Sequence, residues 1–207
     1  MAERLACVIV GYFFGCLLTA QLFVWLKTGR KLPSESTGNP GTAYIADTFG
    51  ARWGAAVLLG DLMKTVFACA LCQYVLFPAL GRQAALYAGL GACIGHCWPF
   101  WNKFHGGKGI AVTIAASLLF SPAVGLISAA AAGTIVVLCG YLAAGSAVLA
   151  AAFPIVTALF GYPVSAVWGA AGMGFIILVR HRANFRRIKE HTEPRKNFSQ
   201  RMKGLKK

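Results

Sequence analysis

Acidic side chains are scarce in this sequence. Its 207 residues include six Asp and Glu against twenty Lys and Arg, and residues 109–179 contain no Asp, Glu, Lys or Arg at all. One helix crosses a bilayer with about 20 mostly apolar residues, so this stretch must cross the bilayer several times. Its length without charge excludes a soluble domain. The sequence therefore predicts an all-α integral membrane protein.

A secreted disulfide framework and a metal centre are also lacking. The seven cysteines lie in or near apolar segments, where a cysteine usually packs as a small apolar residue. Cys93, His96 and Cys97 have the spacing of a partial metal site, but no fourth ligand accompanies them. We therefore expect no disulfide scaffold, no metal and no cofactor.

Breaks in the apolar pattern divide the chain into candidate spans. Gly, Pro and polar residues interrupt the pattern at residues 27–50, 121–122, 140–145 and 161–163. These breaks predict a bundle of seven spans, and five spans with re-entrant segments is the alternative. The seven expected spans cover residues 5–26, 53–80, 84–101, 110–120, 123–140, 142–160 and 163–180.

Basic residues predict the topology. The net charge is +14, and residues 180–207 alone contain eleven Lys and Arg against Glu190 and Glu193. Basic residues near span ends mark the cytoplasmic side. We therefore expect a multi-pass protein of the cell membrane with its N-terminus outside, residues 1–182 forming one membrane domain and residues 183–207 a basic cytoplasmic tail. Topology and attraction to anionic membrane lipids account for the charge, so no nucleic-acid partner is expected.

The clearest candidate for chemistry is a loop with the sequence His105-Gly106-Gly107-Lys108-Gly109. It leads into an apolar helix, whose N-terminus favours negative charge. It is not a Walker A loop, because Asn102 and Gly109 replace the first Gly and the Ser/Thr of that motif. The loop predicts phosphate binding by Lys108 and neighbouring backbone N–H groups, without nucleotide or magnesium. A flexible hinge is the alternative.

Two other polar segments, residues 34–48 and 180–193, are expected on the same side of the membrane. The first contains a turn whose hydroxyl, amide and glycines suit an anion, although an ordinary turn would look the same; its residues are Thr37, Gly38, Asn39 and Gly41. In the second, His181 and Asn184 share one helical face. A stop-transfer signal needs basic residues but no amide, so Asn184 indicates a function.

Three polar residues are expected near or inside the spans. His96 is a candidate general base or phosphate ligand, and a hydrogen-bonded helix-end histidine is the alternative. Asp61 and Lys64 are spaced to pair on one helix, and charges inside a span need partners. We expect a structural pair, in which Lys64 can also complete a basic pocket. Small-residue pairs predict close helix packing at Gly11/Gly15, Gly50/Gly54 and Gly91/Gly95.

Together these motifs resemble the bacterial acyl-phosphate:glycerol-3-phosphate acyltransferases, the PlsY family. The most specific similarity is Gly-His-Cys-Trp-Pro at residues 95–99 followed by residues 104–111. It extends to residues 37–41, 61–64 and 180–187, in the same order and through nearly the whole chain.

The resemblance implies a seven-helix bundle with its active site facing the cytoplasm. Such an enzyme moves a fatty acyl group from acyl phosphate to the 1-hydroxyl of sn-glycerol 3-phosphate, giving lysophosphatidic acid and phosphate in phospholipid biosynthesis. The implied partners are these two substrates and membrane lipids, with no cofactor or metal. The implied catalytic residues are His96, Lys108 and Asn184, and the implied binding residues are Thr37, Gly38, Asn39, Gly41, Lys64, Gly106, Gly107, Gly109 and His181.

Some positions depart from the family pattern. Asp47 stands where the family has an arginine, Thr37 replaces a serine, and Leu142-Ala143 stands where a serine is common. An acyltransferase with another small acceptor, or an inactive member, therefore stays open. A transporter of a phosphorylated anion is the alternative from another class, but residues 109–179 offer no ionisable group except tyrosines and Cys139.

Overall fold

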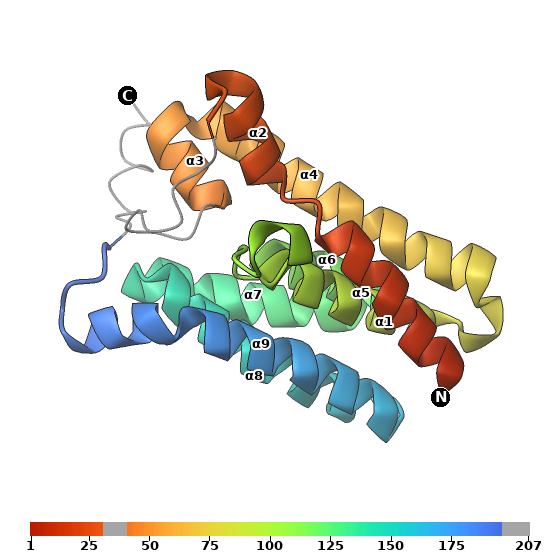
Figure 1. Ribbon diagram of the computed structural model, residues 1–207. Helices are drawn as coiled ribbons and strands as arrows, with labels where there is room; N and C mark the ends of the chain where they lie inside the picture. Colours follow the sequence, from red (N-terminus) through yellow and green to blue (C-terminus); the bar gives the residue numbers. More distant parts are fainter. Residues whose placement is uncertain (31–40, 196–207) are drawn as a thin grey trace. The chain divides into compact units, whose positions relative to one another are not determined.

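The structure is a computed structural model that describes residues 1–30 and 41–195. Within these ranges the chain is helical and contains no strand. Short π and 3₁₀ turns follow α4 and α5, at Leu71–Leu76, Pro78–Leu80 and Phe100–Asn102. The α-helices are α1 (Ala2–Gly15), α2 (Thr19–Thr28), α3 (Thr42–Phe49), α4 (Ala51–Ala70), α5 (Arg82–Cys97), α6 (Ile110–Phe120), α7 (Pro122–Cys139), α8 (Leu142–Leu159) and α9 (Val164–Lys189) (Figure 1).

The all-helical prediction is confirmed. Among the described residues, five helical segments are long and apolar enough to cross a membrane, namely Ala2–Thr28, Ala51–Leu76, Pro122–Cys139, Leu142–Leu159 and Val164–Lys189. α5 has 16 residues and α6 has 11, which is short of the length that one straight span requires. The count of seven spans and the orientation of the termini stay predictions.

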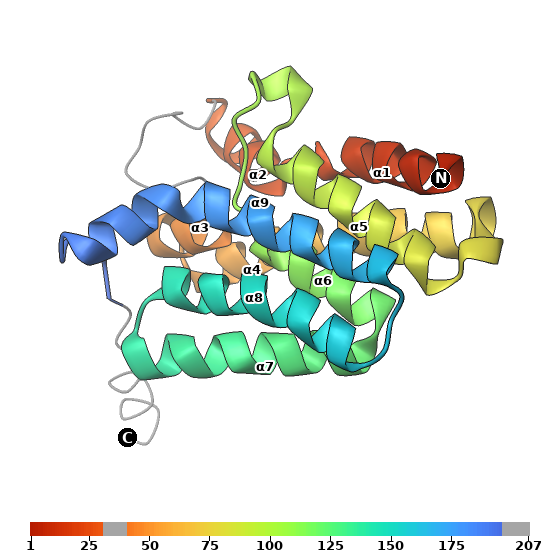
Figure 2. The ribbon, with the colours of Figure 1, turned by 90° about the horizontal axis from the view of Figure 1, so that it is seen from below.

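The described residues form two compact units, which divide between Gly125 and Leu126. In the first unit, α1 lies along α5, as Figures 1 and 2 both show. Each of the four predicted small residues on this pair meets backbone across the interface. A Cβ on Gly11 would fall 1.9 Å from a carbonyl oxygen of α5, and one on Gly15 would fall 2.2 Å from another. A Cβ on Gly91 would fall 2.0 Å from a carbonyl oxygen of α1, and one on Gly95 would fall 2.1 Å from another. The predicted close packing is confirmed here.

Because α1 and α5 pack so closely, a methyl group added at their interface should destabilise the protein. Gly91→Ala would place its methyl group 2.0 Å from the carbonyl oxygen of Val8, so the two helices must separate. We expect a loss of about 1–3 kcal/mol, measured as a lower midpoint of thermal unfolding in detergent. Gly133→Ala is the matched control, because a Cβ there meets nothing within 4 Å. Equal midpoints for the two variants would contradict the close packing.

The second unit contains α8 and α9 packed together, with Gly174 of α9 close to the backbone of Ala150. Many large apolar side chains lie on the outside of both units. Exposed apolar surface of this extent fits a lipid environment. Examples are Phe13, Leu59, Phe67, Leu138, Leu159, Trp168 and Phe175.

The first predicted span is present, but its helix is not continuous. The sequence predicts one helix over residues 5–26, whereas α1 ends at Gly15 and α2 begins at Thr19. A break inside a membrane is tolerated only where other groups bind the released backbone carbonyls. The residues that do so belong to the candidate site described below.

Part of the loop predicted at residues 27–50 is helical. Residues 42–49 form α3, which packs beside α2 and α4 through the Lys27 ammonium group. That group lies 5.7, 5.5 and 4.6 Å from the ring centres of Phe23, Phe49 and Trp53, within the range of cation–π attraction. At the other end of the chain, α9 continues to Lys189, so the first residues of the predicted tail are helical, and the domain boundary at residue 182 stays a prediction.

Candidate active site

The break between α1 and α2 is filled by polar side chains from other elements. The Lys64 ammonium group of α4 lies 2.7 Å from the carbonyl oxygen of Leu17 and 3.3 Å from that of Gly15. The carbonyl of Cys16 accepts a 2.8 Å hydrogen bond from the indole N–H of Trp101. All three carbonyls at the break are therefore bound, as a bilayer interior requires.

Lys64 also contacts two ionisable side chains. Its Nζ is 2.8 Å from Oδ1 of Asp61 and 2.9 Å from Nδ1 of His96. The same Asp61 oxygen accepts a 2.7 Å hydrogen bond from the hydroxyl of Thr19, the first residue of α2. Asp61, Lys64 and His96 are 3, 5 and 8 % exposed. The predicted Asp61–Lys64 pair is confirmed, and it belongs to a larger buried network.

The glycine loop crosses directly over His96. The N–H of Gly107 donates a 2.9 Å hydrogen bond to the carbonyl oxygen of His96, so this N–H is already used within the protein. A Cβ on Gly107 would fall 2.0 Å from Nε2 of the imidazole, and one on Gly106 would fall 2.1 Å from the His96 carbonyl oxygen. Both positions must lack a side chain for the loop to approach so closely.

Gly109 ends the loop and caps α6. Its φ of +80° lies in the left-handed region, which favours glycine. A Cβ there would also fall 2.7 Å from the sulfur of Cys93. Lys108, which is half-buried, therefore comes immediately before the N-terminus of α6, where backbone N–H groups favour an anion.

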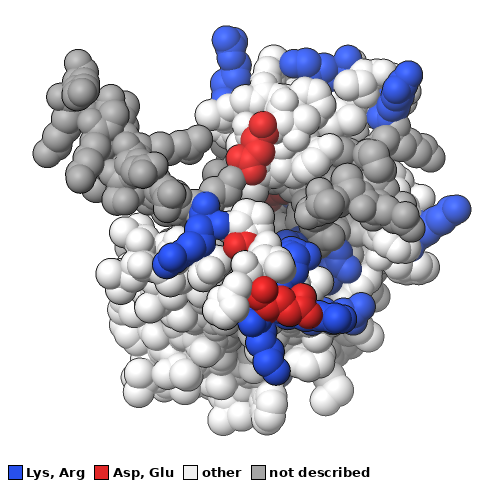
Figure 3. Space-filling model, turned by 90° about the vertical axis from the view of Figure 1, so that its left-hand side faces the viewer, with Lys and Arg blue, Asp and Glu red and all other residues white. Residues whose placement is uncertain are grey.

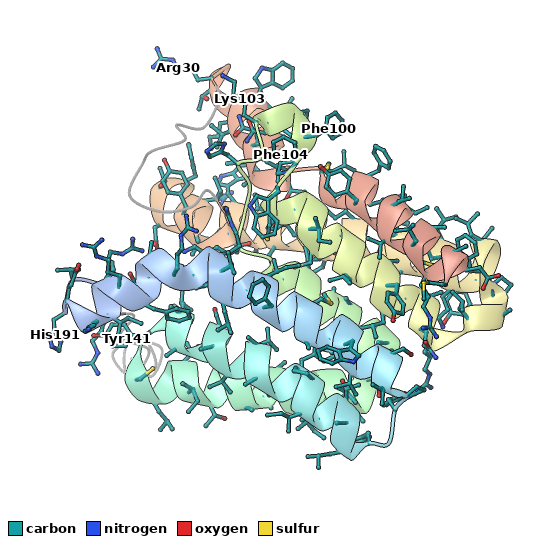
Figure 4. All side chains as sticks on the ribbon, turned by 60° about the horizontal axis from the view of Figure 1, so that its bottom comes forward. Arg30, Phe100, Lys103, Phe104, Tyr141 and His191 are labelled. Carbon is teal, nitrogen blue, oxygen red and sulfur yellow. The ribbon has the colours of Figure 1, made fainter. Side chains whose placement is uncertain are left out.

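The turn between α5 and the glycine loop exposes apolar and basic side chains together. Phe100 and Phe104 are 54 and 58 % exposed, and Lys103 between them is also exposed (Figure 4). Aromatic and basic residues combine in this way at the boundary between lipid and water. The glycine loop thus follows a segment suited to the membrane surface.

His181 and Asn184 lie in the second unit, one turn apart on α9, and both are buried. The Nδ1 atom of His181 is 2.9 Å from the carbonyl oxygen of Ile177; a carbonyl only accepts, so Nδ1 carries the proton. The amide nitrogen of Asn184 donates a 2.5 Å hydrogen bond to Glu193, whose other carboxylate oxygen lies 2.6 Å from Nε of Arg187. Both predicted side chains are thereby fixed in orientation.

Basic side chains surround this end of α9. Arg182, Arg186 and Lys189 are exposed, and Figure 3 shows Lys and Arg on the face where α9 ends. Beyond α9 the chain returns to the α7–α8 turn, where Nε of Arg195 donates a 3.1 Å hydrogen bond to the carbonyl oxygen of Cys139 and its guanidinium lies over the ring of Tyr141. In Figure 4, Tyr141 and His191 lie at the same end of this unit.

The structure thus joins several of the predicted residues but not all. His96, Lys64, Gly106, Gly107 and Gly109 form one cluster in the first unit. Gly41 caps α3, and Asp47 lies on the exposed side of that helix; Thr37, Gly38 and Asn39 lie outside the described residues.

Sequence reasoning missed the part of Thr19 and Trp101 in this cluster. A polar threonine inside an apolar run was the available signal. Across residues 1–30 and 41–195, no three His, Cys, Asp or Glu side chains come together as metal ligands would.

A family model described as glycerol-3-phosphate acyltransferase matches residues 5–191. A glycerol-3-phosphate acyltransferase of Rhizobium meliloti (strain 1021) is 34% identical over 196 residues, covering 94% of this chain and 93% of that protein. Glycerol-3-phosphate acyltransferase 1 of Lactobacillus acidophilus is 40% identical over 126 residues, covering 59% of this chain and 58% of that protein.

Two crystal structures of PlsY (YgiH), an integral membrane glycerol 3-phosphate acyltransferase, have similar folds. They represent its glycerol 3-phosphate form and its lysophosphatidic acid form, with TM-scores of 0.82 and 0.81. Each is 26% identical to this chain and covers 93% of it and 94% of the other chain. This likeness and the apolar helices identify a multi-pass membrane protein.

Proposed function

Since this chain belongs to the glycerol-3-phosphate acyltransferase family, we propose that it transfers a fatty acyl group from acyl phosphate to the 1-hydroxyl of sn-glycerol 3-phosphate. The products are lysophosphatidic acid and phosphate, in phospholipid biosynthesis. The observation that carries this proposal is the match over residues 5–191. Solved relatives in glycerol 3-phosphate and lysophosphatidic acid forms support the same acceptor and product.

The donor phosphate would bind at the glycine loop. Lys108 supplies a positive charge and comes immediately before the N-terminus of α6, where an anion is favoured. Gly106 and Gly109 are the proposed binding glycines of the loop. The N–H of Gly107 is bonded to the His96 carbonyl oxygen. The role of Gly107 is therefore to let the loop approach His96 closely, since it has no side chain. His96 orients a phosphate or assists removal of the hydroxyl proton. Lys64 adds positive charge behind His96.

The acceptor would bind to the remaining predicted residues. Its phosphate and hydroxyl groups suit the hydroxyl, amide and imidazole groups that the sequence predicts for this role. The fixed orientations of His181 and Asn184 support this role, since preorganised donors lose little entropy on binding. The proposed acceptor residues are Thr37, Gly38, Asn39, Gly41, His181 and Asn184.

The reaction needs little covalent help from the protein. The acceptor oxygen attacks the acyl carbonyl carbon, the bond from that carbon to the phosphate oxygen breaks, and the hydroxyl proton balances release of hydrogen phosphate. Positioning two substrates and stabilising their charges can supply most of the rate enhancement. We therefore propose direct transfer, with no acyl-enzyme and no metal or other cofactor.

The membrane arrangement completes the proposal. Seven crossings place the N-terminus outside and the C-terminus in the cytoplasm, with the active site facing the cytoplasm and the acyl chain in the lipid-facing region. The basic residues at the end of α9 and around the glycine loop support this orientation. The short helices α5 and α6 would then each cross the membrane together with the polar residues that flank them.

The test is purified protein in detergent with palmitoyl phosphate and glycerol 3-phosphate. We expect phosphate and lysophosphatidate to form in equal amounts. Phosphate release without lysophosphatidate would contradict the acceptor, and a screen of other hydroxyl compounds with the same donor would then follow. No consumption of palmitoyl phosphate would contradict the enzyme itself.

A further inference from the structure

The sequence leaves two roles open for His96, as a general base or as a phosphate ligand. Which role is possible depends on which ring nitrogen carries the proton. The contacts of Nδ1 with Lys64 and Asp61 bear on this point.

Lys64 is surrounded by acceptors. An ammonium group has three protons to donate and cannot accept a hydrogen bond. Its three shortest contacts are the Leu17 carbonyl oxygen at 2.7 Å, Asp61 Oδ1 at 2.8 Å and His96 Nδ1 at 2.9 Å. The Gly15 carbonyl oxygen at 3.3 Å is a weaker fourth. One Lys64 proton therefore points at Nδ1 of His96.

A proton on Nδ1 would oppose this arrangement. It would face the Lys64 ammonium group at 2.9 Å, donor against donor. Asp61 does not offer an alternative acceptor, because its Oδ1 is 3.6 Å from Nδ1, beyond hydrogen-bond distance. A doubly protonated imidazole would also place two cations in contact within a buried cluster. Nδ1 is therefore the acceptor and Nε2 carries the single proton.

We infer that Lys64 is a positioning residue, which holds His96 as the neutral Nε2–H tautomer so that His96 donates a hydrogen bond to the substrate and does not act as a general base. Nε2 faces the glycine loop, since a Cβ on Gly107 would fall 2.0 Å from it. The group that it meets there is a phosphate oxygen of the substrate or the developing oxyanion. Asp61 and Thr19 in turn hold Lys64. This inference rests on the proposed function, whose phosphate-bearing substrate it needs.

Nitrogen NMR of protein labelled in histidine tests the tautomer without substrate. The His96 signals are assigned by their loss in His96→Gln. We expect an unprotonated Nδ1 and a protonated Nε2 in the wild-type protein. A protonated Nδ1, or an imidazolium at neutral pH, would overturn the inference even if lysophosphatidate is formed. If the tautomer is as expected but no lysophosphatidate forms, the proposed function fails instead.

Two variants separate positioning from structure. Lys64→Met alone would leave the Asp61 carboxylate buried without its cation, so it is combined with Asp61→Asn. In the double variant we expect a mixture of His96 tautomers and a fall in kcat of about 10–100-fold, as for other residues that orient a catalytic side chain. Lys189→Met, at an exposed position on α9, is the control for loss of one lysine. An unchanged tautomer in a folded double variant would contradict the role of Lys64.

His96→Gln separates donor from base. The glutamine amide can replace an Nε2–H donor but cannot accept a proton. We expect His96→Gln to keep kcat within about tenfold of the wild-type value, whereas loss of a general base costs about 10²–10⁴-fold. His96→Ala removes both functions. Equal losses in His96→Gln and His96→Ala would overturn the donor role.

Discussion

Lys108→Ala is expected to reduce kcat by about 10²–10³-fold, the typical cost of removing one group that stabilises developing charge. Lys108 comes immediately before the N-terminus of α6, in the loop that passes over His96. The donor and its leaving phosphate would lose the charge that balances them, while the fold would keep its packing. Phosphate release and lysophosphatidate formation are both measured at saturating palmitoyl phosphate.

The control for Lys108→Ala is Lys103→Asn. Lys103 is an exposed lysine of the preceding turn with a φ of 52°, a conformation that asparagine tolerates. The Lys103→Asn substitution removes one positive charge from the same region and leaves the glycine loop unchanged. Comparable losses in the two variants would indicate a general electrostatic effect and would remove Lys108 from the site.

Gly107→Ala is expected to reduce activity by about 10²-fold, the cost of displacing a reacting group by roughly 1 Å. The new methyl group would fall 2.0 Å from Nε2 of His96. Either the imidazole must rotate away from the loop or the loop must leave His96 and lose the hydrogen bond from the Gly107 N–H. Both outcomes disturb the contact between the loop and His96.

The measurements for Gly107→Ala are kcat and the thermal unfolding midpoint. We expect the midpoint to change by much less than in Gly91→Ala, because the loop lies at one end of the helices. Gly133→Ala, where a Cβ meets nothing within 4 Å, should keep the wild-type activity and have an unfolding midpoint at or above the wild-type value, because alanine has the higher helix propensity. Wild-type activity in Gly107→Ala would contradict the contact between the loop and His96.

Much of the fold was predictable because a bilayer imposes simple rules. Apolar length identifies candidate spans, and small residues four apart predict close packing, which is found where Gly11 and Gly91 meet opposing backbone. The number of crossings was not predictable, since α5 and α6 are too short for the length rule to decide.

The break between α1 and α2 was missed for a different reason. An interruption without proline at the break depends on partners far away in sequence, here Lys64 and Trp101. Local propensity contains no information about such contacts. The same holds for the buried network: the spacing of Asp61 and Lys64 predicts their ion pair, but the 2.9 Å contact with His96 exists only because α4 and α5 pack together.

The candidate site was likewise only partly predictable from the sequence. The glycine loop was recognisable because Gly and Lys have distinctive chemistry in a short segment. The use of the Gly107 N–H inside the protein was not, because it depends on how the chain turns after α5. The binding role of Thr37, Gly38 and Asn39 stays a prediction, since these residues lie outside the described residues.

Direct acyl transfer is the central claim, and acyl phosphate labelled in its acyl chain tests it most directly. Purified protein is mixed with this donor, with and without glycerol 3-phosphate, and the label is followed in protein, free fatty acid and lipid. The account predicts label in lysophosphatidate only when glycerol 3-phosphate is present, and none bound to the protein. Label retained covalently on the protein, or label that reaches only free fatty acid, would contradict it.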